Sequence, residues 1–289
     1  MKIKIRENNT KILDFSDEDR NNFRNFDFKT NFRISSLEQL KTIESCFLPD
    51  IIEAGEIIST RDIATTKFVD VIHSIQNFCK KNKIQFHLST PKILIERDFE
   101  RVYDEIKSLN KGTDCIIINN SKFLKRFVSE NIDIPIELGY GLELNNNNLE
   151  EYTNLKNVKC FDFTKNLSLP NEKFSMKKYT IAGVLKMDKI INCPLKNPQK
   201  SGFLCDAKCK DNFFEITQNE NNFPIICDGF CNCHMYEDIF SNFEKINYLK
   251  SIGINIFTFD FTPLQSYYIP YLIRLFMKNI SKSFKNKKK

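Results

Sequence analysis

The sequence lacks most of the short motifs that identify common enzyme classes. It has only three histidines, and neither HExxH nor GxSxG occurs, which argues against a zinc peptidase and against an esterase-type serine hydrolase. No GxGxxG follows a predicted strand, which argues against a dinucleotide-binding sheet. A cysteine–histidine nucleophile stays open, because such residues can meet in space from distant positions.

Long apolar runs are also absent. No stretch approaches the roughly 20 apolar residues that a membrane-spanning helix needs. The first residues, MKIKIRENNTKILDF, lack the apolar core of a signal peptide. We therefore expect a cytoplasmic protein with reduced thiols. In that compartment the ten cysteines predict metal ligands or buried thiols before they predict disulfides.

The positive charge is concentrated at one end. The formal net charge is +6, but five lysines lie in the last eight residues, so the rest of the chain is close to neutral (6 − 5 = +1). A basic tail at 281–289 is typical of a frayed terminus, and it could also give weak attraction to RNA. The near-neutral remainder argues against a dedicated nucleic-acid binder.

From residue 31 onward, strand-like apolar segments alternate with amphipathic helical segments. The predicted helices cover 36–44, 64–81, 97–109, 122–130, 149–155, 239–252 and 267–280, and Ser36 is the predicted N-cap of the first. The predicted strands cover 32–34, 50–58, 84–88, 115–118, 135–138, 158–163, 179–185 and 254–261.

This alternation requires parallel strands joined by right-handed crossovers. About eight strands in roughly 250 residues favour a closed TIM-barrel-like (β/α) barrel over an open sheet. We therefore predict an α/β fold with an N-terminal extension at 1–30 and the barrel at 31–280. A cysteine-rich region at 178–238 is expected to be an insertion that binds an iron–sulfur cluster, for the following reason.

That region holds six of the ten cysteines: Cys193, Cys205, Cys209, Cys227, Cys231 and Cys233. An iron–sulfur cluster needs four converging thiolates, and a zinc site needs four ligands. Neither C-x3-C pair has the C-x2-C spacing of most zinc sites, which favours iron–sulfur, with zinc as the alternative. The other cysteines lie on predicted helices and strands and are expected to be small buried side chains: Cys46, Cys79, Cys115 and Cys160.

Residues 179–238 resemble the signature region of the peptidase U32 family, the collagenase-like proteins. The shared elements are a strand ending in glycine (TIAGVLKM), a cysteine after a short polar stretch (IINCP), a C-x3-C pair, a hairpin ending in FP (NNFPIICD) and a cysteine before an apolar helix. Upstream, DIIEAGEIISTRDIAT, KIQFHLSTPKIL and IELGYGLELNNNN are similar to earlier strands of the family. The likeness covers most of 35–263 and is specific only in the cysteine region.

The resemblance implies a TIM-barrel-like fold and a [4Fe-4S] cluster held by Cys193, Cys205, Cys209 and a fourth cysteine. In the quinone-hydroxylase branch the fourth ligand lies early, near Ile58-Ser59 here, where this chain has no cysteine. Other branches place it downstream, and Cys231 fits that position better than the alternates Cys227 and Cys233.

Family members include oxygen-independent hydroxylases of tRNA uridine, ribosomal RNA cytidine or the ubiquinone ring, and others have a peptidase label. The resemblance thus implies an iron–sulfur modification enzyme for an RNA base or small aromatic. The alternatives are a U32-type peptidase and a non-catalytic barrel with a structural metal site. Some relatives work as pairs of homologous subunits, so a hetero-partner is a further expectation.

Active sites of (β/α) barrels lie at the carboxyl ends of the strands. His87 lies near such an end, and Glu56 and Arg61 follow another, so these three are the candidate catalytic residues. His73 is expected to be a surface or core-edge residue, and His234 either a second-shell donor to the cluster or an unrelated loop residue. Further carboxylates lie at predicted strand ends: Glu53, Glu137, Glu143 and Asp260.

Overall fold

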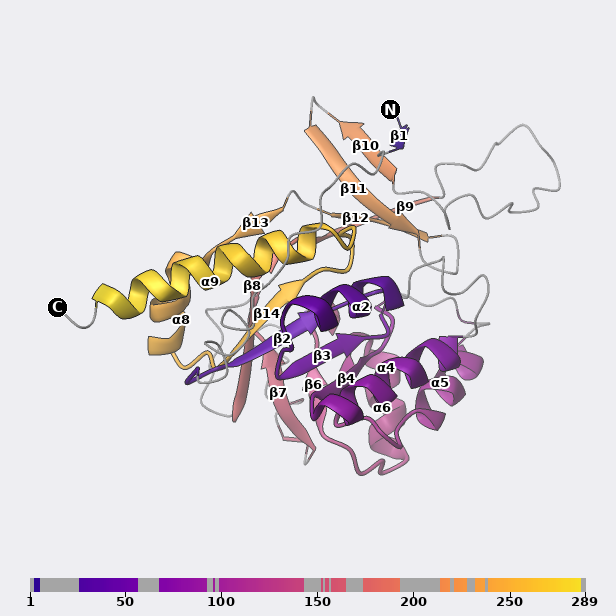
Figure 1. Cartoon of the computed structure of the whole chain (residues 1–289). Coiled ribbons are helices and arrows are strands. Elements are labelled where there is room, and N and C mark those ends of the chain that lie inside the picture. The colour runs from indigo at the N-terminus through magenta and orange to yellow at the C-terminus, as the bar shows by residue number, and fades with distance from the viewer. Residues whose placement is uncertain are drawn as a thin grey trace.

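Eight parallel strands close into a barrel. The computed structural model describes residues 3–5, 26–56, 68–92, 96, 99–142, 152, 154–155, 157–164, 174–192, 214–218, 221–227, 232–236 and 239–286. Around the barrel the strands run in the order β8, β14, β2, β3, β4, β5, β6 and β7, and β7 pairs back onto β8. The predicted TIM-barrel-like α/β fold is therefore confirmed (Figure 1). The strand bounds are β2 (Lys29–Arg33), β3 (Ile51–Ala54), β4 (Gln85–Ser89), β5 (Cys115–Ile118), β6 (Ile136–Leu138), β7 (Val158–Asp162), β8 (Met176–Gly183) and β14 (Ile256–Asp260).

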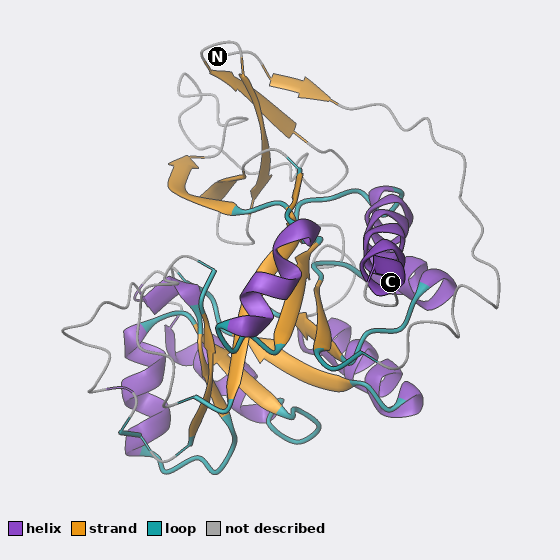
Figure 2. Cartoon of the chain, turned by 90° about the vertical axis from the view of Figure 1, so that its left-hand side faces the viewer, coloured by secondary structure: helices purple, strands orange, loops and turns teal. Residues whose placement is uncertain are grey.

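Helices cover the outside of this barrel (Figures 1 and 2). Ser36 caps the first of them, since its side chain accepts a hydrogen bond from the backbone N–H of Gln39, as the sequence predicted. Two short 3₁₀ segments, η2 (Tyr140–Leu142) and η4 (Phe243–Lys245), lie in the connections. The helices are α2 (Leu37–Cys46), α4 (Phe68–Asn82), α5 (Phe99–Ser108), α6 (Ser121–Ser129), α8 (Ile246–Ser251) and α9 (Tyr268–Asn286).

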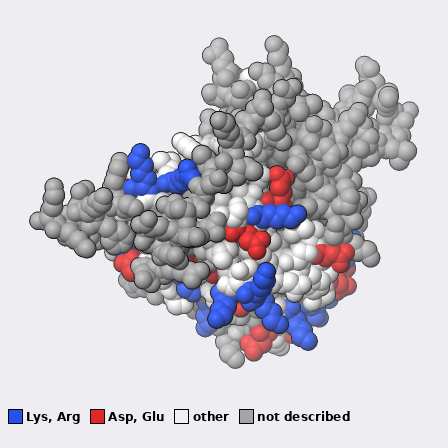
Figure 3. Space-filling model, viewed as in Figure 1, with Lys and Arg blue, Asp and Glu red and all other residues white. Residues whose placement is uncertain are grey.

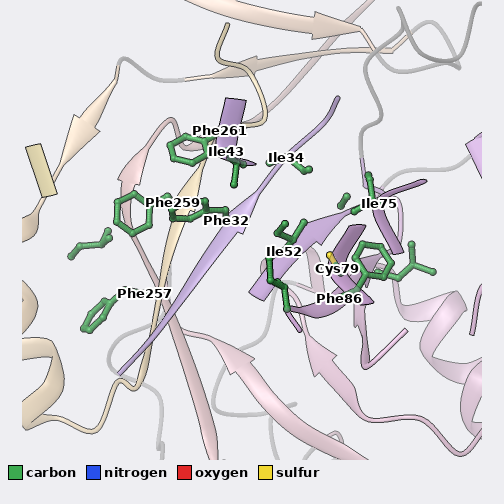
Figure 4. Packing of buried hydrophobic residues seen from close by; sticks show 14 of the residues in the cluster. Phe32, Ile34, Ile43, Ile52, Ile75, Cys79, Phe86, Phe257, Phe259 and Phe261 are labelled. Atoms are coloured by element: carbon green, nitrogen blue, oxygen red, sulfur yellow. The ribbon is translucent and has the colours of Figure 1, made fainter. Parts of the chain in front are cut away.

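The main apolar core lies between the barrel and its helices. Alternate residues of each strand point outward, so Phe257 and Phe259 of β14 pack with Phe32 of β2 in one continuous cluster (Figure 4). Cys79 of α4 and Phe86 of β4 belong to the same cluster (Figure 4). Residues at the intervening positions point into the barrel, where the chemistry differs.

The amino ends of the strands close the barrel with apolar side chains. Ile51 begins β3, Ile256 begins β14, and both are buried in a small cluster with Cys160 of β7. Met176, the first residue of β8, packs against them. This plug leaves the polar interior towards the carboxyl ends of the strands.

A second sheet is built mostly from the segment that lies between β8 and β14 in the sequence. Its antiparallel order is β1, β10, β11, β12 and β9, so the N-terminal strand β1 (Ile3–Ile5) pairs with a distant part of the chain. The insertion leaves at the carboxyl end of β8, and the sheet lies beyond one end of the barrel (Figures 1 and 2). Its other strands are β9 (Lys186–Asn192), β10 (Phe214–Gln218), β11 (Asn221–Cys227) and β12 (Asn232–Tyr236).

The chain returns from the insertion through a strand, and the predicted helix at 239–252 is wrong in its first part. β13 (Phe240–Ser241) pairs antiparallel with Gly183 and Ala182 of β8, and the backbone N–H of Asn242 donates to the carbonyl of Ile181 at 2.8 Å. Pairing with the carboxyl part of β8, which β7 does not reach, overrides the helical pattern, and α8 begins only at Ile246.

Gly183 ends β8 because no other residue fits there. Its φ is +112°, and a Cβ at this position would lie 2.1 Å from the carbonyl oxygen of Asp260 on β14. Glycine alone tolerates both the torsion angle and the close approach of the neighbouring strand. The glycine therefore allows β8 and β14 to approach closely at the point where the chain leaves the barrel for the insertion.

Candidate functional site

The barrel interior is the candidate site, because all buried charges of the described residues lie on barrel strands. A charged side chain inside a protein is costly unless it is paired, so a cluster of six needs an explanation. Each lies at an inward-facing position and is at most 6% exposed: Arg33, Glu53, Glu137, Asp162, Lys178 and Asp260.

Arg33 is at the carboxyl end of β2 and is surrounded by three carboxylates. Its Nε donates to Glu53 Oε1 at 2.6 Å, and its Nη1 donates to Asp260 Oδ2 at 2.9 Å. Its Nη2 donates to Asp162 Oδ2 at 3.2 Å. The Asn31 amide adds a bond to Glu53 Oε2 at 3.0 Å. With three carboxylates bound, Arg33 is not free to receive a phosphate.

Tyr140 covers this arginine from the connection that follows β6. The Arg33 guanidinium lies 5.2 Å from the centre of the Tyr140 ring, within the range of a cation–π contact. The Tyr140 hydroxyl donates to Glu56 Oε2 at 2.8 Å. Burial and the Glu56 carboxylate raise the pKa of Tyr140 well above its usual value, so the phenol stays protonated. Glu56 and Tyr140 thus form the outer layer above Arg33.

The carboxylates around Arg33 differ in their electrostatics. Burial alone would raise the pKa of Glu53, but Arg33 and Lys178 outweigh burial and lower it to about 2. For Asp162 and Asp260, burial outweighs the attraction of Arg33 and raises the pKa of both. Arg33 therefore offsets the cost of burying the Glu53 carboxylate, but not that of the Asp162 and Asp260 carboxylates.

Lys178 of β8 lies deeper, between two glutamates. Its Nζ is 2.7 Å from Glu137 Oε2 and 3.2 Å from Glu53 Oε2, and the side chain is completely buried. Burial favours the neutral amine, but the two carboxylates outweigh it and raise the pKa of Lys178. The ammonium is therefore stable, which argues against a Schiff-base role that needs a free amine.

His87, Cys115 and Glu137 form a possible metal-binding triad next to Lys178. Their ligand atoms all lie within 4.8 Å of one another, and all three residues are buried. Burial lowers the pKa of His87, so its imidazole is neutral. Burial and the nearby Glu137 raise the pKa of the Cys115 thiol. Such a thiol is protonated unless a cation stabilises its thiolate.

The structure describes two of the three predicted catalytic residues, His87 and Glu56. His87 lies inside β4, and Glu56 lies just beyond β3 in contact with Tyr140. Arg61 lies outside the described residues. Of the carboxylates predicted at strand ends, Glu143 also lies outside, and the others point into the barrel: Glu53, Glu137 and Asp260.

The predicted cluster ligands Cys193, Cys205, Cys209 and Cys231 all lie outside the described residues. The alternates Cys227 and Cys233 are on β11 and β12, directly opposite each other in the sheet register. His234 also lies on β12, opposite Ile226.

The burial of His73 and of the cysteines outside the predicted iron–sulfur site agrees with the sequence prediction. His73 is exposed on α4, with Nδ1 2.9 Å from Gln76 Oε1. The cysteines predicted to be small buried side chains are indeed buried: Cys46, Cys79, Cys115 and Cys160.

The sequence analysis missed Arg33, Asp162 and Lys178. Each lies on a strand that carries a second charged residue, and each shares the inward-facing alternation of buried polar residues such as Thr180 and Thr258. That shared inward periodicity was the available signal. It would have marked the barrel interior as polar before the structure was known.

Surface charges offer a contrast to this interior. On the face shown in Figure 3, lysine and arginine side chains are interspersed with aspartate and glutamate. Exposed pairs such as Arg101–Glu105 at 3.0 Å are typical of this surface. No helix among the described residues is both long enough and apolar enough to cross a membrane.

Comparisons with known proteins leave the family open. No family model matches the chain, and no curated protein matches it. One similar solved structure is the spore cortex-lytic enzyme SleL of Bacillus megaterium QM B1551, at 10% identity and a TM-score of 0.39, over 86% of this chain and 73% of that one. Another is SleL of Bacillus cereus, at 12% identity and a TM-score of 0.43, over 87% and 74%. At such TM-scores neither carries an argument about function, and the resemblance to the U32 family stays a prediction.

Proposed function

We propose that the chain is an iron–sulfur enzyme of the U32 type that modifies a small aromatic ring, such as an RNA base, without molecular oxygen. The observation that carries the proposal is the anchoring of the cysteine-rich insertion at the carboxyl end of β8. Barrel active sites lie at that end, so a cluster held by the insertion would be next to the polar interior. The cluster would supply electron transfer or a Lewis-acidic iron for the substrate.

The register of the inserted sheet supports a shared cluster. Asn192, the last residue of β9, pairs with Asn232, the first residue of β12. The residue after Asn192 in the sequence is Cys193, and the residue before Asn232 is Cys231. The pairing therefore brings together the described ends of the two segments that carry these cysteines. This pairing supports a common site for two of the four proposed ligands.

The charge of the barrel interior favours a neutral or cationic group over a phosphate at the reacting position. The only two buried cations of the described residues, Arg33 and Lys178, are already paired with carboxylates. A phosphate would have to displace these pairs and face the remaining carboxylates, at a large electrostatic cost. For an RNA substrate, the base would enter the barrel while the backbone stays outside it.

The test is anaerobic purification followed by iron and sulfide assays and an absorption spectrum. We expect about four irons and four sulfides per chain, as a [4Fe-4S] cluster requires. Cys193→Ser and Cys209→Ser should lose most of both, whereas Cys79→Ser, a buried cysteine on α4, should keep them. A colourless protein with zinc and no iron would refute the proposal and favour a structural metal site.

The peptidase alternative has less support in the described residues. The cysteine and histidine that lie together, Cys115 and His87, are both fully buried, and the raised pKa of Cys115 disfavours the thiolate nucleophile that such an enzyme needs. Cleavage of gelatin or casein that persists in Cys193→Ser would nevertheless favour a peptidase. Loss of thermal stability without any change in nucleoside or quinone products would favour the non-catalytic barrel.

A further inference from the structure

Three side chains of the types that bind metal ions meet on adjacent strands inside the barrel. His87 of β4 and Cys115 of β5 are partners in the sheet register. Glu137 of β6 pairs with Ile117, two residues along from Cys115 and therefore on the same face of the strand. The ligand atoms of the three residues lie within 4.8 Å of one another. Rigid strands, rather than loops, hold all three.

Two of these side chains have unsatisfied polar atoms. Both carboxylate oxygens of Glu137 and the Nδ1 of His87 lack a hydrogen-bond partner among the described residues, although the two side chains are 0% and 2% exposed. The 3.5 Å between His87 Nδ1 and Glu137 Oε2 is too long for a normal hydrogen bond. Lys178 pairs with Glu137 by charge at 2.7 Å, but without hydrogen-bond geometry. Buried polar atoms rarely stay unsatisfied, so they indicate a missing partner.

The charge count of the interior points in the same direction. Arg33 and Lys178 supply two positive charges, against four carboxylates on Glu53, Glu137, Asp162 and Asp260. With all six ionised, the sum is +2 − 4 = −2. Uncompensated buried charge is strongly unfavourable, and one divalent cation would offset it.

The ligand types define which cation fits. Imidazole nitrogen, thiolate sulfur and carboxylate oxygen are zinc ligands at about 2.0–2.3 Å, whereas calcium and magnesium prefer six or more oxygens. Tetrahedral bonds of that length put ligand atoms about 3.3–3.7 Å apart, so the widest separation in the triad must contract by up to about 1 Å. We propose that His87, Cys115 and Glu137 bind one divalent transition metal of the zinc type inside the barrel. This proposal does not depend on the function proposed above.

Lys178 competes with a metal ion for Glu137, but it has a second carboxylate partner. The ammonium contacts Glu137, but it also lies 3.2 Å from Glu53 Oε2. When a metal takes Glu137, Lys178 keeps Glu53 as its partner and stays neutralised. The thiol of Cys115 would lose its proton to bind the metal, which adds one negative charge beside the cation. Binding therefore releases a proton, and the net charge of the interior changes from −2 to −1 (−2 + 2 − 1).

The first experiment measures the metal content of the full chain expressed in zinc-supplemented medium. Wild-type protein, Cys115→Ser and Glu137→Gln are compared by elemental analysis and native mass spectrometry. We expect each variant to contain one zinc equivalent less than the wild type. With cobalt(II) as the probe, Cys115→Ser should also lose one thiolate-to-cobalt charge-transfer contribution.

Two controls separate this site from the insertion. Cys79→Ser makes the same chemical change at a buried thiol outside the barrel interior, and it should keep the full metal content. Cys193→Ser removes a proposed cluster ligand, and it should keep the equivalent that depends on Cys115. If folded Cys115→Ser and Glu137→Gln chains hold as much metal as the wild type, the proposal is wrong.

A second measurement on the unmodified chain decides the matter if the variants fail to fold. Crystals grown with zinc are measured on both sides of the zinc absorption edge. An anomalous peak between His87, Cys115 and Glu137 supports the site. If the map has no peak there while zinc is in excess, the proposal is refuted, whatever happens in the cysteine-rich insertion.

Discussion

Replacing Arg33 by methionine should strongly destabilise the barrel. Methionine has a similar volume and cannot pair with a carboxylate. The change would leave Glu53, Asp162 and Asp260, all at most 2% exposed, without their shared partner. Removing one side of a buried ion pair costs about 3–5 kcal/mol, because the remaining charge stays buried. We expect a loss in this range in the free energy of unfolding.

The matched control is Arg101→Met. Arg101 forms an ion pair with Glu105 at 3.0 Å on α5, but its side chain is 55% exposed. An exposed helical pair of this kind contributes only about 0.3–0.5 kcal/mol. Urea unfolding followed by circular dichroism compares the two variants directly. The same substitution should thus have an effect several times larger inside the barrel than on the helix surface.

The penalty should also depend on pH. In Arg33→Met, burial would raise the pKa of Glu53 towards or above its unfolded value, since Arg33 is the largest of the causes that now lower it. A carboxyl group whose folded pKa is raised destabilises the protein at neutral pH and less so in acid, where it is protonated in both states. The difference from the wild type should therefore be smaller at pH 4 than at pH 7. If Arg33→Met loses no more stability than Arg101→Met, the account of the charged interior is wrong.

Other changes test single features of the fold. Ser36→Ala removes the N-cap of α2 and should cost about 1 kcal/mol in urea unfolding. Gly183→Ala puts a Cβ 2.1 Å from the Asp260 carbonyl oxygen, so we expect misfolded or much less stable protein. Gly112→Ala has a similar positive φ but no neighbour closer than 3.5 Å, so it should cost only about 1–2 kcal/mol. Glu53 has a folded pKa of about 2, below its unfolded value, so the stability it gives at neutral pH should fall as pH drops from about 4 towards 2. A Glu53→Gln chain should lack that part of the acid dependence.

Each of these expectations has an outcome that would contradict it. Equal stability of Ser36→Ala and the wild type would show that the cap contributes nothing. Equal losses in Gly183→Ala and Gly112→Ala would show that backbone strain alone matters, rather than contact with β14. An unchanged acid transition in Glu53→Gln would mean that other carboxylates control acid unfolding.

The barrel could be predicted from the sequence because its signal is local. Each strand is a short apolar run, each helix has an apolar face, and the number of repeats decides between a closed barrel and an open sheet. Residues 115–118 were predicted as a strand with the bounds that β5 has. The failure at Phe240 and Ser241 has a tertiary cause, since only the folded β8 provides the edge that these residues join.

Some residues of the site could be predicted singly from the sequence, but their arrangement could not. His87 stood out because it is rare and lies near a strand end. Cys115 was correctly expected to be buried, but its proximity to His87 and Glu137 depends on the register between strands, which no local pattern gives. Arg33 and Lys178 look like ordinary surface charges in the sequence. They face inward only because the closed barrel fixes the direction of every second side chain.

The apolar plug of Ile51, Cys160, Ile256 and Met176 separates the buried charges from the amino end of the barrel. We therefore expect protons and water that exchange with Lys178 or Glu137 to come past Arg33 and Tyr140 rather than through the plug. Enlarging the plug by Ile256→Phe should leave their exchange with solvent unchanged, whereas a smaller side chain in place of Tyr140 should accelerate it. We therefore expect the arginine–tyrosine layer to set how fast Lys178 and Glu137 exchange protons with solvent.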